Sequence, residues 1–311
     1  MKEKKKSNDL LFSVVVITYN SSVFIEETLD SIYNQTYKNI ELIISDDAST
    51  DNTIDICKNW LKKNSKRFID THLSTVESNT GIPSNINRGI RLAKGAWIKG
   101  IAGDDAMFKE GIKYGVDYIH SNKEVCIFSS DRISYRDMLN DDCIISKSSD
   151  EESSFFKLSS AEQYSSLLYE NRISAVSMFF KKSLIDEVGG FDESIRFMED
   201  HPMWLTLTKK GVKIFHLAKV TVKYRVHGLS VRTSDSNKSS LFNRFYLKIR
   251  SFQKVYIYPN ISAFGRFSLS YEYYRHYIID SLGLNRKNII CKSIYRMSGI
   301  ISPIKLKSLY S

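Results

Sequence analysis

The sequence has few cysteines and no long apolar stretch, and both shortages exclude classes of protein. Its four cysteines are widely spaced and form no Cys-x-x-Cys pair, and its six histidines lack the spacing of a zinc-binding helix. We therefore expect neither a zinc site nor a disulfide framework, but a reduced chain. No segment approaches the roughly 18 to 20 apolar residues that cross a bilayer, and no apolar signal-peptide core follows residues 1–9. We expect a cytoplasmic protein, either free or peripheral on the cytoplasmic face of the membrane.

Acidic residues are scarce in the last quarter of the chain. Residues 241–311 hold twelve lysines and arginines but only Glu272 and Asp280, so their excess equals the net charge of the whole chain, +10. They also hold nine of the 18 tyrosines. Such a shift in composition predicts a boundary, and the serine-rich residues 230–240 are typical of a loop. We expect a catalytic domain of residues 1–235 and a basic, aromatic-rich helical region of residues 236–311.

The first hundred residues alternate between strand-like and helix-like patterns. Apolar runs at residues 12–17, 40–45 and 97–101 are typical of strands buried on both faces, and a weaker strand is expected at 72–74. Helical spacing of apolar residues separates these runs, and the last helix is expected to end at Lys94-Gly95 with a glycine cap. The alternation predicts an α/β fold with a Rossmann-like, mostly parallel sheet flanked by helices.

Polar clusters follow three of the predicted strands, namely Thr18-Tyr19-Asn20, Asp46-Asp47 and Asp104-Asp105. Ligands of parallel sheets bind outside the carboxyl ends of the strands, so we expect the clusters at one rim. Adjacent carboxylates repel each other unless a positive charge lies between them. Mn²⁺ or Mg²⁺ carrying a diphosphate would supply that charge, because hard cations bind carboxylate and phosphate oxygens. The pattern predicts a nucleotide-diphosphate site.

An ordered set of short motifs makes residues 12–230 resemble the family 2 glycosyltransferases, an inverting family with a GT-A fold. The motifs occupy residues 14–20, 31–37, 44–51, 79–82, 87–90, 93–95, 103–105, 179–182, 189–193 and 198–200. Each motif is weak alone, but the ordered set is specific. The resemblance implies transfer of a hexose from a nucleotide-diphosphate sugar, most often a UDP-sugar, to a glycan or lipid-linked glycan. Capsule, O-antigen or exopolysaccharide synthesis is the implied process.

The resemblance also implies which residues hold the nucleotide. In the family, the tyrosine after the first strand and the second aspartate of the next pair hold the base, and these are Tyr19 and Asp47 here. Ile86 stands where many members carry arginine, so Arg88 is a candidate to supply the missing charge. The nucleotide-binding candidates are Thr18, Tyr19, Asn20, Asp46, Asp47, Asn87, Arg88 and Asp104. The structural alternative is that Asp46 and Asp47 merely cap the following helix.

The metal motif of the family is usually Asp-x-Asp-Asp, and it reads Ala102-Gly103-Asp104-Asp105 here, so the leading acid is missing. The resemblance implies Asp104 as the main ligand of Mn²⁺ or Mg²⁺, with Asp105 second. His227 could complete the metal shell, although a histidine just after a strand is more often structural. A solvated acidic turn is the alternative for the aspartates.

The pair Glu199-Asp200 matches the family's Glu-Asp motif, with Asp200 in the position of the catalytic base and Glu199 beside it. Such a base would take the proton of the acceptor hydroxyl during in-line attack. Pro202 suits the first turn of the helix that presents the base. The alternative is an acidic helix N-terminus that the helix dipole favours.

The basic C-terminal region has three interpretations. Basic residues interleaved with aromatics, as in residues 242–250, suit an interfacial helix on an anionic membrane. They also suit packing on the catalytic domain or an oligomer contact. Nucleic-acid phosphates are the least favoured partner, and we expect no nucleic acid.

Two rival functions carry their own signatures. A sugar-nucleotidyltransferase should have a glycine-rich basic loop after the first strand, and residues 18–22 contain neither glycine nor a base. A non-catalytic basic protein that binds membrane or nucleic acid has no reason to gather acids at one sheet rim.

Overall fold

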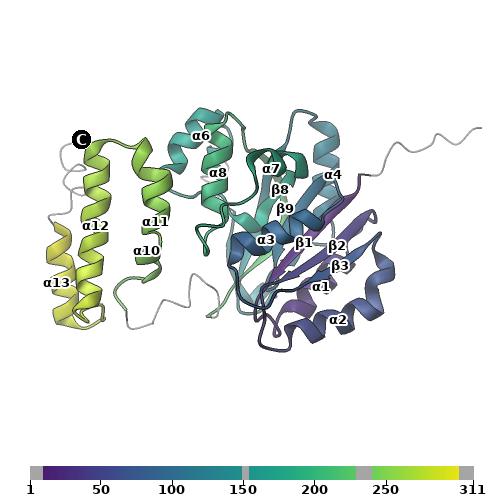
Figure 1. Ribbon diagram of the computed structural model, residues 1–311, viewed down its shortest axis with the longest axis horizontal. Helices are drawn as coiled ribbons and strands as arrows, with labels where there is room; N and C mark the ends of the chain where they lie inside the picture. Colours follow the sequence, from purple (N-terminus) through teal and green to yellow (C-terminus); the bar gives the residue numbers. More distant parts are fainter. Residues whose placement is uncertain (1–9, 149–153, 229–239, 301–311) are drawn as a thin grey trace, which may run out of the picture. The chain divides into compact units, whose positions relative to one another are not determined.

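The computed structural model describes residues 10–148, 154–228 and 240–300 (Figure 1). It divides the chain into two compact units, Met1–Val226 and His227–Ser311. The loop predicted at residues 230–240 lies outside the described residues except for Ser240. No helix of the described residues is long and apolar enough to cross a membrane.

The first unit is built on one sheet of nine strands among the described residues, ordered β3-β2-β1-β4-β8-β6-β9-β5, with β7 paired to β6. The strands are β1 (Phe12–Thr18), β2 (Ile40–Asp46), β3 (Thr71–Ser74), β4 (Trp97–Ala102), β5 (Ala106–Met107), β6 (Ile127–Arg136), β7 (Ile144–Lys147), β8 (Met178–Lys181) and β9 (Phe215–Val226). The first four strands run parallel, as predicted. The other strands pair antiparallel except β6 with β9, so the parallel arrangement belongs to the N-terminal half.

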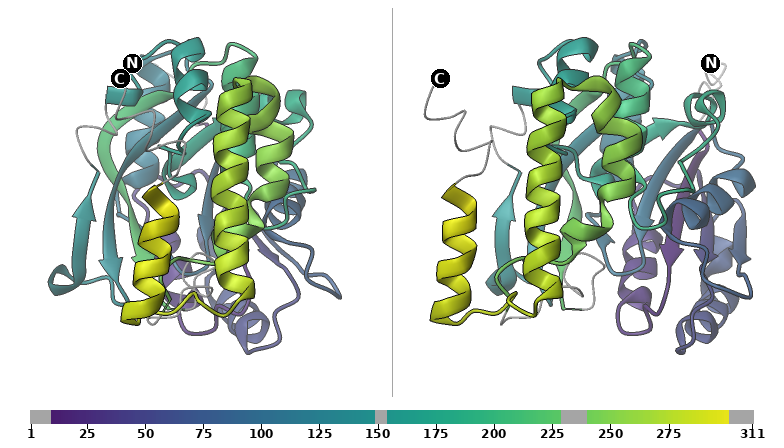
Figure 2. Two further views of the ribbon diagram at one scale, coloured as in Figure 1. Left: turned by 90° about the vertical axis from the view of Figure 1, so that its left-hand side faces the viewer. Right: turned by 60° about the vertical axis from the view of Figure 1, so that its left-hand side comes forward.

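Helices connect the strands and cover the sheet (Figure 1, Figure 2). They are α1 (Ile25–Tyr33), α2 (Thr53–Asn64), α3 (Ile82–Leu92), α4 (Gly111–Ser121), α6 (Ser160–Leu167), α7 (Lys182–Val188) and α8 (Asp200–Lys209), with short 3₁₀ turns η1 (Ser65–Arg67), η2 (Asp141–Cys143) and η3 (Ala175–Ser177). The strand residues Val14 and Leu42 are fully buried, as expected for strands covered on both faces. Phe128 and Phe179 stack with ring centroids 4.8 Å apart in the core.

The prediction of a glycine cap at Lys94-Gly95 was wrong. The helix α3 ends at Leu92, and Ala93 is already extended. Instead, the Gly95 N–H donates to Ser13 Oγ (2.9 Å) and Glu41 Oε1 (2.7 Å). A Cβ on Gly95 would lie 2.4 Å from Ser13 Oγ. Glycine is needed here because the chain passes close to β1, not because a helix ends.

A buried lysine lies where the parallel and antiparallel halves of the sheet meet. Lys99 belongs to β4, which pairs with β8, and its side chain is fully buried. Its Nζ donates to the carbonyls of Val176 and Met178 and lies 4.8 Å from the centroid of the Phe179 ring. Burial lowers the pKa of Lys99 to about 7. The polar end of this lysine therefore ties β4 to the chain that enters β8.

The second unit is helical, which confirms the predicted helical C-terminal region. Its elements are α10 (Phe245–Lys248), α11 (Arg250–Phe252), the π-helix η4 (Gln253–Ile257), the 3₁₀ turn η5 (Tyr258–Asn260), α12 (Ala263–Ser281) and α13 (Ile289–Ile300). The side chain of Ser262 caps α12 by accepting from the Gly265 N–H. The length of α12 agrees with its sequence, because residues 266–281 contain neither proline nor glycine.

Candidate active site

The three polar clusters lie at one rim of the sheet. Strand β1 lies between β2 and β4, and its register aligns Thr18 with Asp46 and Ile17 with Ala102. The Asp47 N–H donates to the Thr18 carbonyl (2.9 Å), and the Gly103 N–H donates to the Ile17 carbonyl (2.9 Å). Both acidic pairs therefore begin where neighbouring parallel strands end. This is the edge at which parallel sheets bind ligands.

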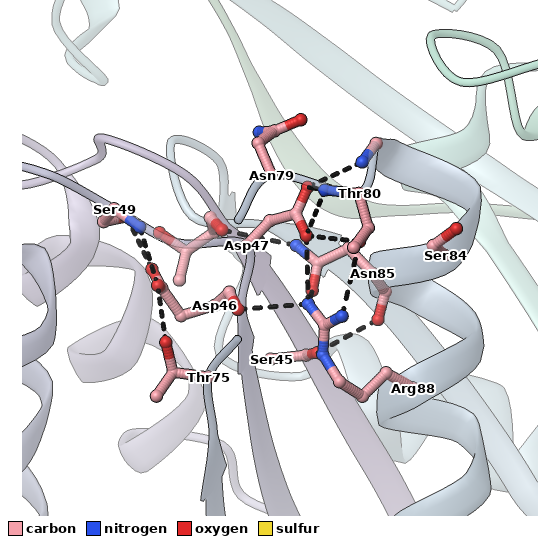
Figure 3. A network of polar contacts seen from close by, with 12 residues as sticks. Ser45, Asp46, Asp47, Ser49, Thr75, Asn79, Thr80, Ser84, Asn85 and Arg88 are labelled. Atoms are coloured by element: carbon pink, nitrogen blue, oxygen red, sulfur yellow. Dashed lines mark hydrogen bonds and ion pairs between the residues drawn. The ribbon is translucent and has the colours of Figure 1, made fainter. Parts of the chain in front are cut away.

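Asp47 is buried and accepts hydrogen bonds from four donors (Figure 3). They are the Thr80 N–H (3.0 Å), the Thr80 hydroxyl (2.5 Å), the Gly81 N–H (2.8 Å) and Arg88 Nη2 (3.2 Å). Gly81 has φ +97°, and a Cβ there would lie 2.5 Å from the Arg196 carbonyl, so glycine is required at this turn. The start of α3 thus fixes one orientation of the Asp47 carboxylate.

Arg88 reaches the rim from the second half of α3. Its Nε donates to Ser45 Oγ (3.1 Å), and its Nη2 donates to the Asp46 carbonyl (3.0 Å) and Asn85 Oδ1 (2.7 Å). The guanidinium is therefore held beside Asp47, at the end of β2 (Figure 3). A positive charge is present at the rim although Ile86 occupies the position where arginine is usual in the family.

Asn87 is not brought to the rim. Its Nδ2 donates to the Phe191 carbonyl (2.8 Å) and Glu193 Oε1 (2.9 Å), and its Oδ1 accepts from the Phe191 N–H (2.9 Å). Successive helix residues point about 100° apart, so Asn87 faces the segment 189–193 while Arg88 faces Asp47. The contacts of Asn87 favour a positioning role over contact with a nucleotide.

The segment that Asn87 anchors leads directly to Asp200. Between this segment and Asp200, the Arg196 carbonyl accepts from the Ile82 N–H (2.9 Å), and Arg196 Nη2 donates to the Asn79 carbonyl (2.7 Å). The loop before α8 is therefore fastened to the turn that holds Asp47.

Three of the predicted nucleotide contacts hold the loops of the rim in place. Asp46 is buried and accepts from the Ser49 N–H (2.9 Å) and hydroxyl (2.5 Å) within the loop before α2. The alternative of a helix cap was wrong, because α2 begins at Thr53 and its N-cap residue Asn52 has no side-chain cap hydrogen bond. Asn20 accepts from the Thr50 N–H (2.8 Å) and adopts φ +50°. Thr18 is buried beneath Gly103, where a Cβ would lie 2.9 Å from its hydroxyl.

Tyr19 is exposed, as Asn20 is, and 48% of it is accessible to solvent. It follows Thr18, the last residue of β1, so it lies at the edge of the sheet where β1 ends. An exposed aromatic side chain can pack on a nucleobase. The rim therefore combines buried acidic side chains with an accessible aromatic one.

The two aspartates after β4 have different environments. Asp105 is 3% exposed, and its Oδ1 accepts from the Arg225 N–H of β9 (2.8 Å). Burial, with a contribution from the charge of Asp104, raises the pKa of Asp105 well above its usual range. Asp104 is only partly buried, and its carbonyl accepts from Arg225 Nε (2.7 Å). Asp105 therefore fastens the turn to β9, and the role of the less buried Asp104 as a metal ligand stays a prediction.

Arg225 of β9 holds this turn in place. Its guanidinium also pairs with Glu27, donates to the Asp137 carbonyl and lies 4.5 Å from the centroid of the Phe24 ring. The described residues contain no group of three or more His, Cys, Asp or Glu side chains able to hold a metal alone. A metal that takes one or two carboxylates and fills its shell with phosphate oxygens fits this donor set. His227 belongs to the second unit, so its place in the shell stays a prediction.

Asp200 is the first residue of α8 and is buried. Its Oδ2 accepts from Asn171 Nδ2 (2.8 Å), and its Oδ1 accepts from the His201 N–H (2.7 Å). The His201 ring lies 2.7 Å from the Leu167 carbonyl, a contact that joins α8 to α6. Glu199 is partly buried and precedes the helix as its N-cap residue. Asp200 therefore has a defined orientation. The sequence did not predict that Asn171 holds it.

Comparison with known proteins decides the family. Residues 13–185 match Glycosyl transferase family 2. The chain belongs to this family. A family 2 relative from Escherichia coli, the UDP-Glc:alpha-D-GlcNAc-diphosphoundecaprenol beta-1,3-glucosyltransferase WfaP, is 28% identical over 225 residues, covering 71% of this chain and 79% of the relative. The putative teichuronic acid biosynthesis glycosyltransferase TuaG of Bacillus subtilis is 24% identical over 246 residues, covering 79% and 90%.

Solved structures show that this family 2 chain has the GT-A fold. The S. aureus TarS fragment 1–349 in complex with UDP-GlcNAc superposes with a TM-score of 0.59 at 19% identity, covering 92% of this chain and 79% of that one. The mannosyltransferase PcManGT of Pyrobaculum calidifontis, in complex with GDP-Man and Mn²⁺, gives 0.53 at 18% identity, covering 78% and 61%. The predicted fold is confirmed, and the chain is a glycosyltransferase.

Several residues of the family 2 site escaped sequence reasoning. Thr80 and Gly81 lie in a motif of the resemblance, but the motif alone did not reveal that they donate to Asp47. Arg225 lies at the end of an apolar strand pattern, where a buried arginine is unusual and could have been noticed. Asn171 carries no sequence signal, because nothing in its spacing points to Asp200.

Proposed function

We propose that this glycosyltransferase is an inverting, metal-dependent hexosyltransferase that uses a UDP-sugar and a lipid-linked glycan acceptor in surface polysaccharide synthesis. The observation that carries the proposal is the common rim of β2, β1 and β4, with Asp47, Arg88 and Asp104 at one edge of parallel strands. A nucleotide diphosphate needs a base contact, a positive charge and a metal ligand. The rim offers candidates for all three.

The donor half of the proposed reaction uses the rim. Tyr19 would pack on the uracil ring, and Asp47 would accept from the pyrimidine N3–H. Asp104 would hold Mn²⁺ or Mg²⁺, which supplies neutralisation of the leaving diphosphate. Arg225 and Asp105 keep that turn fixed against β9. A rigid turn favours catalysis because the charges are in position before the sugar leaves.

The acceptor half uses Asp200. Its carboxylate would take the proton of the acceptor hydroxyl while the oxygen attacks the anomeric carbon, and the nucleoside diphosphate leaves from the opposite face. One displacement inverts the configuration at that carbon. Glu199 lies one residue earlier and is the nearest alternative base in sequence. The contacts of Asp200 with Asn171 and His201 support it as the positioned member of the pair.

The acceptor and process are inferred from the relatives. WfaP acts, by its name, on a diphosphoundecaprenol-linked sugar, and TuaG is named for teichuronic acid biosynthesis. We extend this chemistry to the present chain as a capsule, O-antigen or exopolysaccharide repeat unit built on a lipid carrier at the cytoplasmic face of the membrane. A free glycan acceptor is the alternative within the same proposal.

A panel of nucleotide sugars tests the proposed reaction. We expect one or more UDP-sugars to be hydrolysed faster with Mn²⁺ than with EDTA, and the newly released sugar to have the opposite anomeric configuration by NMR. GDP-sugars should react poorly. Retention of configuration, or preference for a GDP-sugar, would contradict the proposal. Release of pyrophosphate from UTP and a sugar phosphate would support a sugar-nucleotidyltransferase instead.

Asn171→Ala tests whether the asparagine positions the base. The carboxylate of Asp200 loses the hydrogen bond from Asn171 Nδ2 that orients it. We expect transfer to fall roughly tenfold to a hundredfold, because the base is less well oriented.

The control for this variant is Asn34→Ala, which removes an exposed asparagine bonded to the Asp30 carbonyl on α1. It should leave the rate of transfer unchanged. UDP binding should be the same in both variants, since Asn171 lies in neither the rim nor α3. A loss of transfer in Asn171→Ala together with a lower thermal unfolding temperature would mean that Asn171 supports the fold rather than the base.

A further inference from the structure

The two long helices of the second unit leave large apolar side chains uncovered. Along α12 they lie three, four or seven residues apart, and along α13 three or four residues apart, so each set lies on one face of its helix. The exposed residues of this apolar face are Phe264, Phe267, Tyr274, Ile278, Leu282, Ile290, Ile294 and Met297. Phe267 is 60% exposed, Ile290 71% and Met297 68%. Exposed apolar residues arranged in helical stripes indicate a contact surface rather than scattered single exposures.

The stripes of both helices lie on one side of the pair. The helices run antiparallel, because Tyr271 near the middle of α12 donates to the Ser298 carbonyl, whereas the later His276 lies 3.1 Å from Tyr295 Oη (Figure 2). Successive helix residues point about 100° apart, so these contacts fix the direction in which every other side chain points. By this count, the exposed apolar side chains of α12 and those of α13 point to the same side of the pair. On α13, the exposed Lys292 and Arg296 point away from the apolar stripe.

The surface of the second unit has more positive than negative side chains. Its two acids in residues 240–300 are mostly buried and paired: Glu272 with Arg275 (2.6 Å) and Asp280 with Arg244 (2.9 Å). Exposed bases remain at Lys254, Arg266, Arg286, Lys287, Lys292 and Arg296. The described surface of the second unit therefore offers positive charge together with an apolar face.

We infer that the apolar face of α12 and α13 docks on an anionic lipid bilayer, with the helices lying in the plane of the headgroups. Interfacial helices combine an apolar face with lysine and arginine on the polar face, which is the arrangement of α13. A second copy fits less well, because it carries the same excess of bases and supplies no acids for them, whereas an anionic bilayer supplies negative charge. This inference goes beyond the proposed reaction and does not depend on it.

Some of the basic residues cannot serve as lipid contacts. The guanidinium carbon of Arg250 lies 4.9 Å from the centroid of the Tyr258 ring and 4.6 Å from that of Tyr273. Arg275 packs on Tyr295 at 4.5 Å while it pairs with Glu272. Reversal of these charges would damage the interior of the unit. A test of membrane docking must therefore change α13, whose bases are exposed.

The test is vesicle sedimentation of the full chain with and without phosphatidylglycerol in phosphatidylcholine vesicles. Wild type should bind only the anionic vesicles, and binding should weaken as the Debye length falls from about 10 Å at 0.1 M salt to about 3 Å at 1 M. Ile290→Glu with Met297→Glu should reduce binding by tenfold or more, because the apolar face is lost. Lys292→Glu with Arg296→Glu should reduce it several-fold.

The matched control is Lys62→Glu with Lys63→Glu, two exposed lysines in the last turn of α2 in the first unit. It makes the same change in net charge and should leave vesicle binding nearly unchanged. UDP binding and thermal unfolding verify that each variant folds. Equal binding to neutral vesicles, or full binding by the Ile290→Glu, Met297→Glu variant, would overturn the inference. A wild-type dimer that this variant converts to a monomer would assign the face to a second copy instead.

Discussion

Asp200→Asn is expected to lower the rate of sugar transfer by two or more decades while UDP binding is unchanged. The substitution keeps the size of the side chain but removes the carboxylate that accepts a proton, and a positioned base contributes roughly 10²–10⁴-fold. The asparagine can still accept from Asn171, so the loop before α8 should keep its place. Transfer rates with saturating donor and acceptor, beside calorimetric titration with UDP, measure the two quantities.

Glu199→Gln is the matched control, because it makes the same chemical change one residue earlier. We expect transfer by this variant to stay within a few-fold of wild type. If Asp200→Asn also stays within a few-fold, Glu199 or another group is the base. Loss of UDP binding together with transfer would instead indicate a disturbed fold, which the thermal unfolding temperature would reveal.

Asp104→Ala is expected to abolish the effect of metal on nucleotide binding. Wild type should bind UDP much more tightly with Mn²⁺ or Mg²⁺ than with EDTA, since the metal bridges the carboxylate and the diphosphate. Replacing a residue that only orients a metal ligand typically lowers metal affinity roughly 10–100-fold, so removing the ligand itself should lower it by at least as much. In the variant, UDP affinity should be the same with metal and with EDTA, as measured by titration calorimetry.

Asp105→Asn separates the two aspartates. Asp105 is buried and bonded to the Arg225 N–H, a bond that the amide oxygen of asparagine can also accept, so the replacement should hold the turn in place and keep a clear metal response. Unchanged metal response in Asp104→Ala, with loss of response in Asp105→Asn, would move the ligand role to Asp105. Metal-independent binding by wild type would remove the metal from the proposed reaction.

The N-terminal half of the sheet could be predicted because its strands are buried on both faces. Such strands are continuous apolar runs, and residues 12–17 and 40–45 became β1 and β2 with only one residue added at the end of each. The direction of β8 and β6 could not be predicted in the same way. Their pairing depends on neighbours far away in sequence, and short strands such as Met178–Lys181 carry no mark of direction.

The location of the rim could be predicted from the polar residues that follow the strands, but the role of each residue could not. Asp46 accepts from Ser49, three residues later, and Asn20 accepts from Thr50 of another loop, and a list of polar residues reveals neither pair. Asn87 and Arg88 are adjacent in sequence, but their side chains contact different parts of the protein, since successive helix residues point about 100° apart. Asn171 meets Asp200 across 29 residues, and only the folded chain brings them together.

The four donors around Asp47 have a consequence for nucleotide selectivity. A carboxylate has about four lone-pair sites, so these donors already fill it. In the proposed donor site, a uracil N3–H would have to share or replace an existing bond, and the gain in affinity would be small. Cytosine presents a lone pair at N3, which would face a fixed negative charge with no donor between them. The carboxylate would therefore act as a filter that rejects the wrong base more than it strengthens binding of the right one.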